Sequence, residues 1–266
     1  MGVTPAAAWE QADAAVAEAI RAKVGGERLV VGLSGAQGSG KSTMAPRLVQ
    51  RLSAAGLRAQ VLALDDFYLT EAERAELART VHPLLLTRGV PGTHDIGLLR
   101  GAIDSLLAGR EAAIPIFDKA RDDRAGWRTL DSAADVILLE GWCVGARPEP
   151  SQRLLAPVNA LERDEDASGA WRDWVNQHLA SDYAALFARL DLRFFLRAPE
   201  FDVVLDWRAE QERGLPSGGM SGREVERFIH HYERITRWML EDEPADLVFD
   251  LDPARRPVAQ PRRPHA

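Results

Sequence analysis

A glycine-rich segment near the N-terminus combines the residue types that a phosphate-binding site needs. The run VVGLSGAQGSGKST spans Val30–Thr43 and leads through four glycines to Lys41 and Ser42. Glycines adopt backbone angles that other residues avoid, so successive amides can point at phosphate oxygens. Arginine is the usual basic residue of this chain, and its only lysines are Lys23, Lys41 and Lys119. A lysine in this turn indicates a site that needs a compact point charge.

Residues 35–42 match the phosphate-loop pattern G-x-x-x-x-G-K-[ST], with an apolar strand before it and a helical segment after it. The positive N-terminal end of that helix adds to the attraction for an anion. In this motif the lysine reaches the β- and γ-phosphates and the hydroxyl binds magnesium, so we expect ATP and Mg²⁺ as ligands. The expected ATP-binding residues of the loop are Gly35, Ala36, Gln37, Gly38, Ser39, Gly40, Lys41, Ser42 and Thr43.

Acidic residues end two further apolar runs. VLALDD ends in Asp65 and Asp66, and VILLEG carries Glu140. In a doubly wound sheet both ends open onto the crevice beside the phosphate loop. Two acids there indicate a division of labour, in which one joins the magnesium shell and one accepts a proton from a substrate hydroxyl. For Asp66 the alternative is that it caps the following turn.

The elements that must position these residues alternate between strands and helices. Continuous apolar runs predict strands at 28–34, 60–66, 135–141, 192–198 and 246–252. Helical patterns cover about 5–23, 42–54, 95–108, 171–190 and a stretch within 220–240. This alternation predicts an α/β fold of the phosphate-loop type, with a parallel sheet of about five strands and helices on both faces. We expect one domain over 1–266, a turn-rich surface segment at about 148–171 and a disordered tail at 253–266.

Composition restricts the partners. The 266 residues are 46% hydrophobic, which is enough for a full core, and the formal net charge is -7. That charge, without a basic stripe before the last dozen residues, argues against nucleic acid or an anionic membrane as the main partner. The single cysteine, Cys143, fits a reducing compartment, and the N-terminus lacks the plan of a signal peptide. We therefore expect a cytoplasmic protein that acts on a small molecule, in an oligomeric state that the sequence leaves open.

A series of longer motifs covers residues from about 28 to 240. They are GLSGAQGSGKST, LALDDFYLT, HPLLLTRGVPGTHD, IPIFDKARDDRAGW, LLEGWCVGARP, VNALE, WRDWVNQHL and MSGREVERFIHHYERIT. This series resembles the superfamily of uridine kinase, phosphoribulokinase and pantothenate kinase, and within it the D-glycerate 3-kinases of plants, fungi and their bacterial relatives. The resemblance implies a magnesium-dependent kinase that converts ATP and D-glycerate to ADP and 3-phosphoglycerate.

Two alternatives stay open. One is a kinase of the same superfamily that acts on another small hydroxylated metabolite, such as a nucleoside or a pantothenate-like acceptor. The other is a nucleotide-binding switch that hydrolyses slowly without an acceptor.

The resemblance also implies roles for individual residues. Asp65 is the implied catalytic base, Lys41 acts on the transferred phosphoryl group, and Glu140 joins Ser42 in the magnesium shell. A lid at about 199–220 is implied to bring Arg208 and Arg213 to ATP. The implied substrate-binding residues are Asp66, Tyr68, Arg88, His94, Asp95, Asp118, Lys119 and Arg124. His82 departs from the pattern, which has an asparagine before PLL.

The charge of the acceptor distinguishes among these residues. A small carboxylic acid offers one anionic group and little surface, so its affinity must come from charge-assisted hydrogen bonds. Lys119 and Arg88 are therefore the expected carboxylate ligands. For Lys119 the alternative is an ion pair with Asp118 or a neighbouring acid, and for His94 it is a structural position in a turn.

Overall fold

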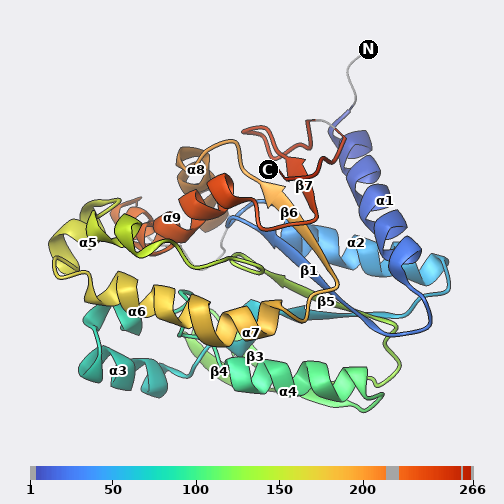
Figure 1. Cartoon of the computed structure of the whole chain (residues 1–266), viewed down its shortest axis with the longest axis horizontal. Helices are drawn as coiled ribbons and strands as arrows, with labels where there is room; N and C mark the ends of the chain where they lie inside the picture. The colour runs from blue at the N-terminus through green and yellow to red at the C-terminus, as the bar shows by residue number, and fades with distance from the viewer. Residues whose placement is uncertain (1–3, 214–221, 259, 265–266) are drawn as a thin grey trace.

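The computed structural model describes residues 4–213, 222–258 and 260–264 (Figure 1). Residues 214–220 of the expected lid lie outside this range. The helices and strands are, in chain order, α1 (Pro5–Lys23), β1 (Leu29–Gly35), α2 (Lys41–Ala54), β2 (Ala59–Ala63), η1 (Leu64–Phe67), α3 (Glu71–Thr80), η2 (Pro83–Leu86), α4 (Ile96–Leu107), β3 (Ala112–Asp118), β4 (Asp123–Leu130), β5 (Val136–Gly141), η3 (Ser151–Leu155), α5 (Ala160–Glu165), α6 (Ala170–His178), η4 (Leu179–Tyr183), α7 (Ala184–Phe187), β6 (Leu192–Arg197), α8 (Asp202–Arg213), α9 (Gly222–Asp242) and β7 (Leu247–Asp250).

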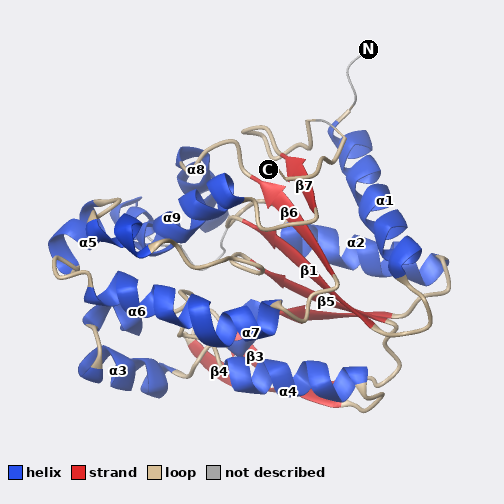
Figure 2. Cartoon of the chain, in the orientation of Figure 1, coloured by secondary structure: helices blue, strands red, loops and turns tan. Residues whose placement is uncertain are grey.

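The central sheet has five parallel strands in the order β2-β5-β1-β6-β7 (Figure 2). β1 lies in the middle, where Val31 pairs with Leu138 of β5 and with Leu192 of β6. All five expected strands form, and helices lie on both faces, so the predicted fold class is confirmed. No described helix combines the length and apolar character that crossing a membrane requires.

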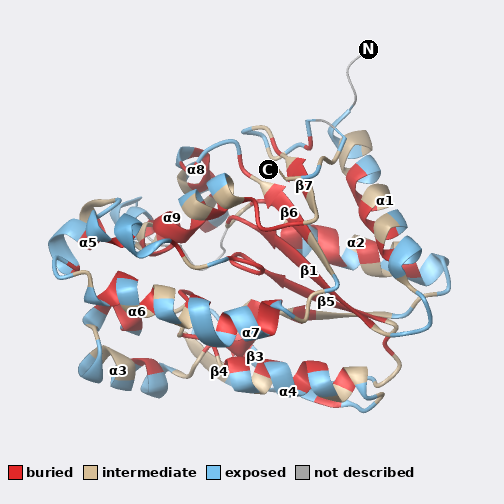
Figure 3. Ribbon diagram, in the orientation of Figure 1, coloured by how far each residue is buried: buried red, intermediate tan, exposed pale blue. Residues whose placement is uncertain are grey.

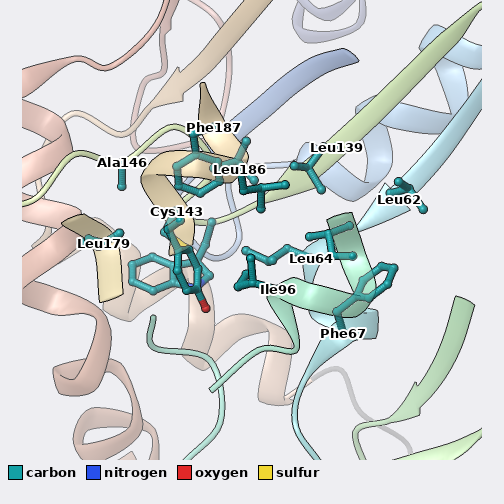
Figure 4. Packing of buried hydrophobic residues seen from close by; sticks show 14 of the residues in the cluster. Leu62, Leu64, Phe67, Ile96, Leu139, Cys143, Ala146, Leu179, Leu186 and Phe187 are labelled. Carbon is teal, nitrogen blue, oxygen red and sulfur yellow. The ribbon is translucent and has the colours of Figure 1, made fainter. Parts of the chain in front are cut away.

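Successive residues of β1 face opposite sides of the sheet and join two different hydrophobic layers. Val30 belongs to the layer built with α4, α6 and α7, whereas Val31 and Leu33 belong to the layer built with α1 and α2. The central strands β1 and β5 are accordingly buried on both faces (Figure 3). Figure 4 shows part of the first layer, in which Leu64, Ile96 and Leu139 lie together. Two apolar layers explain why these strands read as continuous apolar runs.

An antiparallel hairpin, β3–β4, is not among the expected elements. Its strands are only partly buried, and Pro115 interrupts the apolar pattern of β3. Such a half-exposed segment lacks the continuous apolar character by which the other strands are recognised. The hairpin lies beside α4 and carries Lys119 in its turn (Figure 1).

Two local expectations need correction. β2 ends at Ala63, before the acidic pair, because residues 64–67 form the 3-10 turn η1 and bury Leu64 and Phe67. The segment at 148–171 contains η3 and α5 and buries Leu154 and Leu161, so it is not only a surface excursion.

The tail is ordered where the structure describes it, so the expected disorder is wrong for those residues. The amide of Val248 donates to the carbonyl of Arg262 at 2.7 Å, and the reverse bond is 3.0 Å. Arg262 also binds Asp250 and Glu243, in each case with an atom pair at 2.8 Å. Arg262 thus gains acidic partners in β7 and in the turn before it, and these contacts offset the entropy lost on ordering.

Candidate active site

The glycine-rich loop joins β1 to α2 and needs glycine for its shape. Gly38 and Gly40 have φ values of 78° and 99°, which other residues rarely adopt. A Cβ atom on Gly38 would lie 2.6 Å from the Cβ atom of Trp207. Gly40 is the N-cap of α2 and makes no side-chain cap, so no side chain competes there for the first amides of the helix. This loop has the form of an anion site at a helix N-terminus.

Lys41, Ser42 and Glu140 meet at the start of α2 and the end of β5. The Lys41 ammonium donates to the carbonyl of Ala36 at 3.1 Å, and the Ser42 hydroxyl donates to Glu140 Oε1 at 2.9 Å. Burial lowers the pKa of Lys41, although the carboxylates of Glu140 and Asp65 oppose the change. Burial likewise raises the pKa of Glu140, and Lys41 opposes it. A ligand here meets a desolvated cation beside a carboxylate.

Asp65 lies in η1 and is bound by Lys119 from the turn of the β3–β4 hairpin. The Lys119 ammonium lies 2.7 Å from Asp65 Oδ2. Burial by itself would raise the pKa of Asp65, but the charge of Lys119 and hydrogen bonds from Lys119 and Tyr68 outweigh it and lower this pKa to about 2. Asp65 is therefore ionised at neutral pH. Lys119 thus forms an ion pair, which was the alternative to its expected role as a carboxylate ligand, and its partner is Asp65 and not Asp118.

Arg88 is fixed by contacts on both its main chain and its side chain. Its guanidinium pairs with Asp122 of the hairpin turn and lies over the Phe117 ring, 5.6 Å from the centroid. Tyr232 donates its hydroxyl to the Arg88 carbonyl at 2.7 Å, and Trp142 donates its ring N–H to the next carbonyl at 2.8 Å. The segment that carries Arg88 is thus held between β5, α9 and the hairpin.

One pocket brings the phosphate loop and the hairpin together. Its lining residues are Gln37, Gly38, Lys41, Ser42, Asp65, Tyr68, Arg88, Lys119, Glu140, Gly141, Trp142, Arg208, Gln211, Phe228 and Tyr232. Part of the expected donor side and the expected acceptor-side residues Asp65, Tyr68, Arg88 and Lys119 therefore share one cavity. Arg208 reaches it from α8, where it lies over Phe228 at 5.0 Å and pairs with Glu212.

Several expected substrate residues are not on the wall of this pocket because they hold the hairpin and α4 in place. Asp66 binds Arg128 at 3.2 Å, and Asp95 binds Arg124 at 3.3 Å. Asp95 also caps α4, and Asp118 accepts backbone amides in the hairpin turn. For these residues the structure shows supporting contacts.

His94 lies behind the pocket wall. Its ring stacks at 4.8 Å from that of Tyr68, and its Nδ1 atom lies 2.5 Å from the hydroxyl of Tyr183. Burial lowers the pKa of His94 to about 4, so the ring is neutral at neutral pH. This placement matches the alternative of a structural histidine more closely than a position on the pocket wall.

The remaining expected ATP residues lie in three places. Gly40 and Thr43 line a second cleft on the outer side of the loop. Gly35, Ala36 and Ser39 are buried within the loop. Arg213 lies exposed at the end of α8, outside the linings of both clefts.

Sequence reasoning misses part of the acceptor side. Gln211, Phe228 and Tyr232 line the pocket from α8 and α9, and Asp122 holds Arg88. A helical pattern shows that Phe228 and Tyr232 belong to an apolar stripe, but it does not tell which neighbour the stripe faces. The acidic run around Asp122 was a visible signal, since it lies within the motif that carries Lys119.

The oxygen atoms at Ser42 and Glu140 suit magnesium. Within residues 4–213, 222–258 and 260–264, no group of three or more His, Cys, Asp or Glu side chains could hold a metal ion. Magnesium in kinases usually keeps several waters and takes one or two protein oxygens together with substrate phosphates. The Ser42–Glu140 pair fits that requirement.

Known proteins resemble this chain in sequence and in fold. The Phosphoribulokinase / Uridine kinase family model matches residues 30–146. An uncharacterized kinase of Schizosaccharomyces pombe is 36% identical over 222 residues, which are 78% of this chain and 79% of that protein. The chloroplastic D-glycerate 3-kinase of Arabidopsis thaliana is 29% identical over 257 residues, covering 86% of this chain but only 54% of the plant protein.

A solved structure gives the same result for the fold. The D-glycerate 3-kinase of Cryptococcus neoformans superposes with a TM-score of 0.75 at 25% identity and covers 99% of this chain and 100% of its own. The phosphate loop, the parallel sheet and the kinase relatives all indicate the same family. The chain belongs to the phosphoribulokinase/uridine kinase family of P-loop kinases.

Proposed function

We propose that this protein transfers the γ-phosphoryl group of ATP to a hydroxyl of a small hydroxy acid, with D-glycerate as the first candidate acceptor. The observation that carries the proposal is the shared pocket, in which Lys41 and Ser42 of the phosphate loop face the same space as Asp65, Arg88 and Lys119. D-glycerate 3-kinases among the similar proteins support the choice of acceptor.

The donor side stabilises negative charge. Lys41 is 8% exposed, so its ammonium acts in a largely desolvated setting where charge interactions are stronger than in water. Ser42 and Glu140 would hold magnesium, which, when bound, neutralises charge on the phosphates. The glycine loop adds main-chain amides at the N-terminus of α2.

The acceptor side combines a base with cations. Asp65 would accept the proton of the attacking hydroxyl, while Arg88 and Lys119 would bind the carboxylate of the acceptor. A carboxyl with a pKa of about 2 is a weak base while Lys119 holds it. When Lys119 turns to the acceptor, Asp65 loses that charge and hydrogen bond, and burial then raises its pKa toward that of a better base.

A nucleoside is the second candidate acceptor. Tyr68, Trp142, Phe228 and Tyr232 also line the pocket, and aromatic rings suit a flat base. Trp142 and Tyr232 use their polar atoms to hold the Arg88 segment, and their rings contact each other edge to face. These contacts give both rings a structural role, and the two cations favour the carboxylate.

An acceptor screen tests the proposal. ADP release is measured for the purified protein with ATP and magnesium, alone or with D-glycerate, L-glycerate, other hydroxy acids or nucleosides. We expect turnover that requires D-glycerate or a close hydroxy acid. Efficient turnover of an uncharged nucleoside would overturn the carboxylate assignment, and slow turnover that no acceptor accelerates would indicate a switch.

A further inference from the structure

A second cleft lies on the outer side of the phosphate loop. Its lining residues are Gly38, Gly40, Lys41, Ser42, Thr43, Glu210, Gln211 and Arg255. It shares Gly38, Lys41, Ser42 and Gln211 with the pocket that holds Asp65. A triphosphate lying on the loop with its terminal phosphate toward Asp65 therefore directs its other end into the outer cleft.

Arg255 reaches this cleft from the tail and is held there by several contacts. Its φ is 63°, and its amide donates to the carbonyl of Asp252 at 2.9 Å. Its guanidinium pairs with Glu210 and lies over the Trp207 ring, 5.6 Å from the centroid. Trp207 in turn donates its ring N–H to the carbonyl of Pro253 at 2.8 Å. Contacts within the chain thus position this side chain on α8.

Arg255 and Glu210 do not use all of their hydrogen-bonding groups on each other. The Nε atom of Arg255 is buried and has no hydrogen-bond partner within the described chain. That atom is closed to a ligand, but the Arg255 side chain as a whole is 28% exposed, so its outer N–H groups can donate to a ligand oxygen in the cleft. The charge of Arg255 is already balanced by Glu210, whose side chain is 60% exposed and can accept a further hydrogen bond. A neutral group that both donates and accepts fits this pair better than another phosphate does.

We propose that Arg255 and Glu210 bind the ribose hydroxyls of the nucleotide, so that the tail forms part of the ATP site. A ribose diol supplies an acceptor for the exposed N–H groups of Arg255 and a donor for the carboxylate of Glu210. The inference rests on the proposed function only in that a nucleoside triphosphate lies on the loop, and it is independent of the acceptor.

Binding measurements without any acceptor test it. Dissociation constants are measured calorimetrically, with magnesium, for ATP, for 2′,3′-dideoxy-ATP and for inorganic tripolyphosphate. We expect the native protein to bind ATP more tightly than the dideoxy compound. Arg255→Met is expected to weaken ATP binding about tenfold, the loss of roughly one hydrogen bond to a charged group, and to leave the other two ligands unchanged.

The neighbouring Arg256 provides a matched control. It pairs with Asp252 and is not on the wall of either loop cleft, so Arg256→Met is expected to bind all three ligands as the native protein does. Glu210→Gln keeps the shape of its side chain and is expected to reduce the preference for ATP over the dideoxy compound. Equal thermal unfolding midpoints of the Arg255 and Arg256 variants would exclude a folding defect.

Two results would overturn the ribose assignment. One is unchanged ATP binding by Arg255→Met, and the other is an equal loss for tripolyphosphate, which would mean that the residue acts on the phosphates or on the loop. Failure of glycerate turnover in the acceptor screen would leave these binding results unaffected, so the two proposals fail separately.

Discussion

The two walls of the shared pocket are held by different kinds of interaction. The donor wall is built from main chain, with glycines at positive φ and a buried Lys41 bonded to a carbonyl of the loop. The acceptor wall is built from side-chain ion pairs, Lys119 with Asp65 and Arg88 with Asp122, whose acidic partners are 34% and 42% exposed. Each of these cations is paired with a carboxylate, and a carboxylate ligand offers it a partner of the same kind. The donor wall is preformed, whereas the acceptor wall can exchange partners.

Removal of the donor-wall cation is expected to have the largest effect. Lys41→Ala removes a contact that strengthens as the phosphoryl group transfers, which costs roughly 3–5 kcal/mol of transition-state stabilisation. Steady-state turnover measures this loss, and ATP binding is expected to fall much less. Lys23→Ala is a suitable control because Lys23 is exposed at the end of α1. Near-normal turnover by Lys41→Ala would refute the assignment of the donor wall.

The next effect concerns the base. Asp65→Asn keeps the shape of the side chain but cannot accept a proton, so turnover is expected to fall by about 10²–10⁴-fold with little change in the acceptor KM. Asp66→Asn is the matched control, since Asp66 binds Arg128 away from the pocket wall. If Asp66→Asn abolished turnover while Asp65→Asn were mild, the two roles would be exchanged.

A smaller effect is expected for the two acceptor-wall cations. Lys119→Met and Arg88→Met each remove one charged hydrogen bond to a carboxylate, so the acceptor KM is expected to rise at least about tenfold. The KM for ATP is expected to stay nearly unchanged. Arg121→Met, an exposed change in the same hairpin turn, serves as the control. Normal use of glycerate by both variants would show that the ion pairs of this wall are only structural.

The smallest expected effect is the titration of His94, which tests whether its ring lies behind the acceptor wall or lines the pocket. The unfolded chain protonates His94 near pH 6.5 and the folded chain only near pH 4. The free energy of unfolding is therefore expected to fall as the pH decreases from about 7 to about 4, and less so in His94→Gln. The NMR signals of the His94 ring are expected to show no titration between pH 5 and 8. A midpoint near 6.5 would mean that this ring opens to the pocket.

The donor wall is predictable from sequence because its contacts are local. One run of residues supplies β1, the glycines, Lys41 and Ser42, and buried parallel strands leave continuous apolar runs. The acceptor wall depends on contacts between distant segments, such as Lys119 with Asp65 and Tyr232 with the carbonyl of Arg88. No short pattern specifies which partner a charged side chain meets.

The unknown partners of charged side chains also explain why the sequence-based predictions for Asp95, Asp118 and the tail differ from the structure. Asp95 and Asp118 stand in segments that resemble a substrate site, yet each satisfies nearby backbone amides, as a helix cap or turn residue does. The composition of the tail suggested disorder, but Arg262 binds acids of β7 and the preceding turn. Composition indicates how much apolar surface a segment can bury, but it does not tell which charged side chains of other segments the segment will contact.

The central position of β1 has a consequence for biosynthesis. β1 is made before the other four strands of this sheet, yet Val31 pairs with Leu138 and Leu192, which are made much later. Parallel pairing over such separations is slow, and an apolar strand without partners is prone to aggregation. Recombinant production is therefore expected to yield more soluble protein at low temperature, where translation is slow and the hydrophobic attraction between nascent chains is weaker.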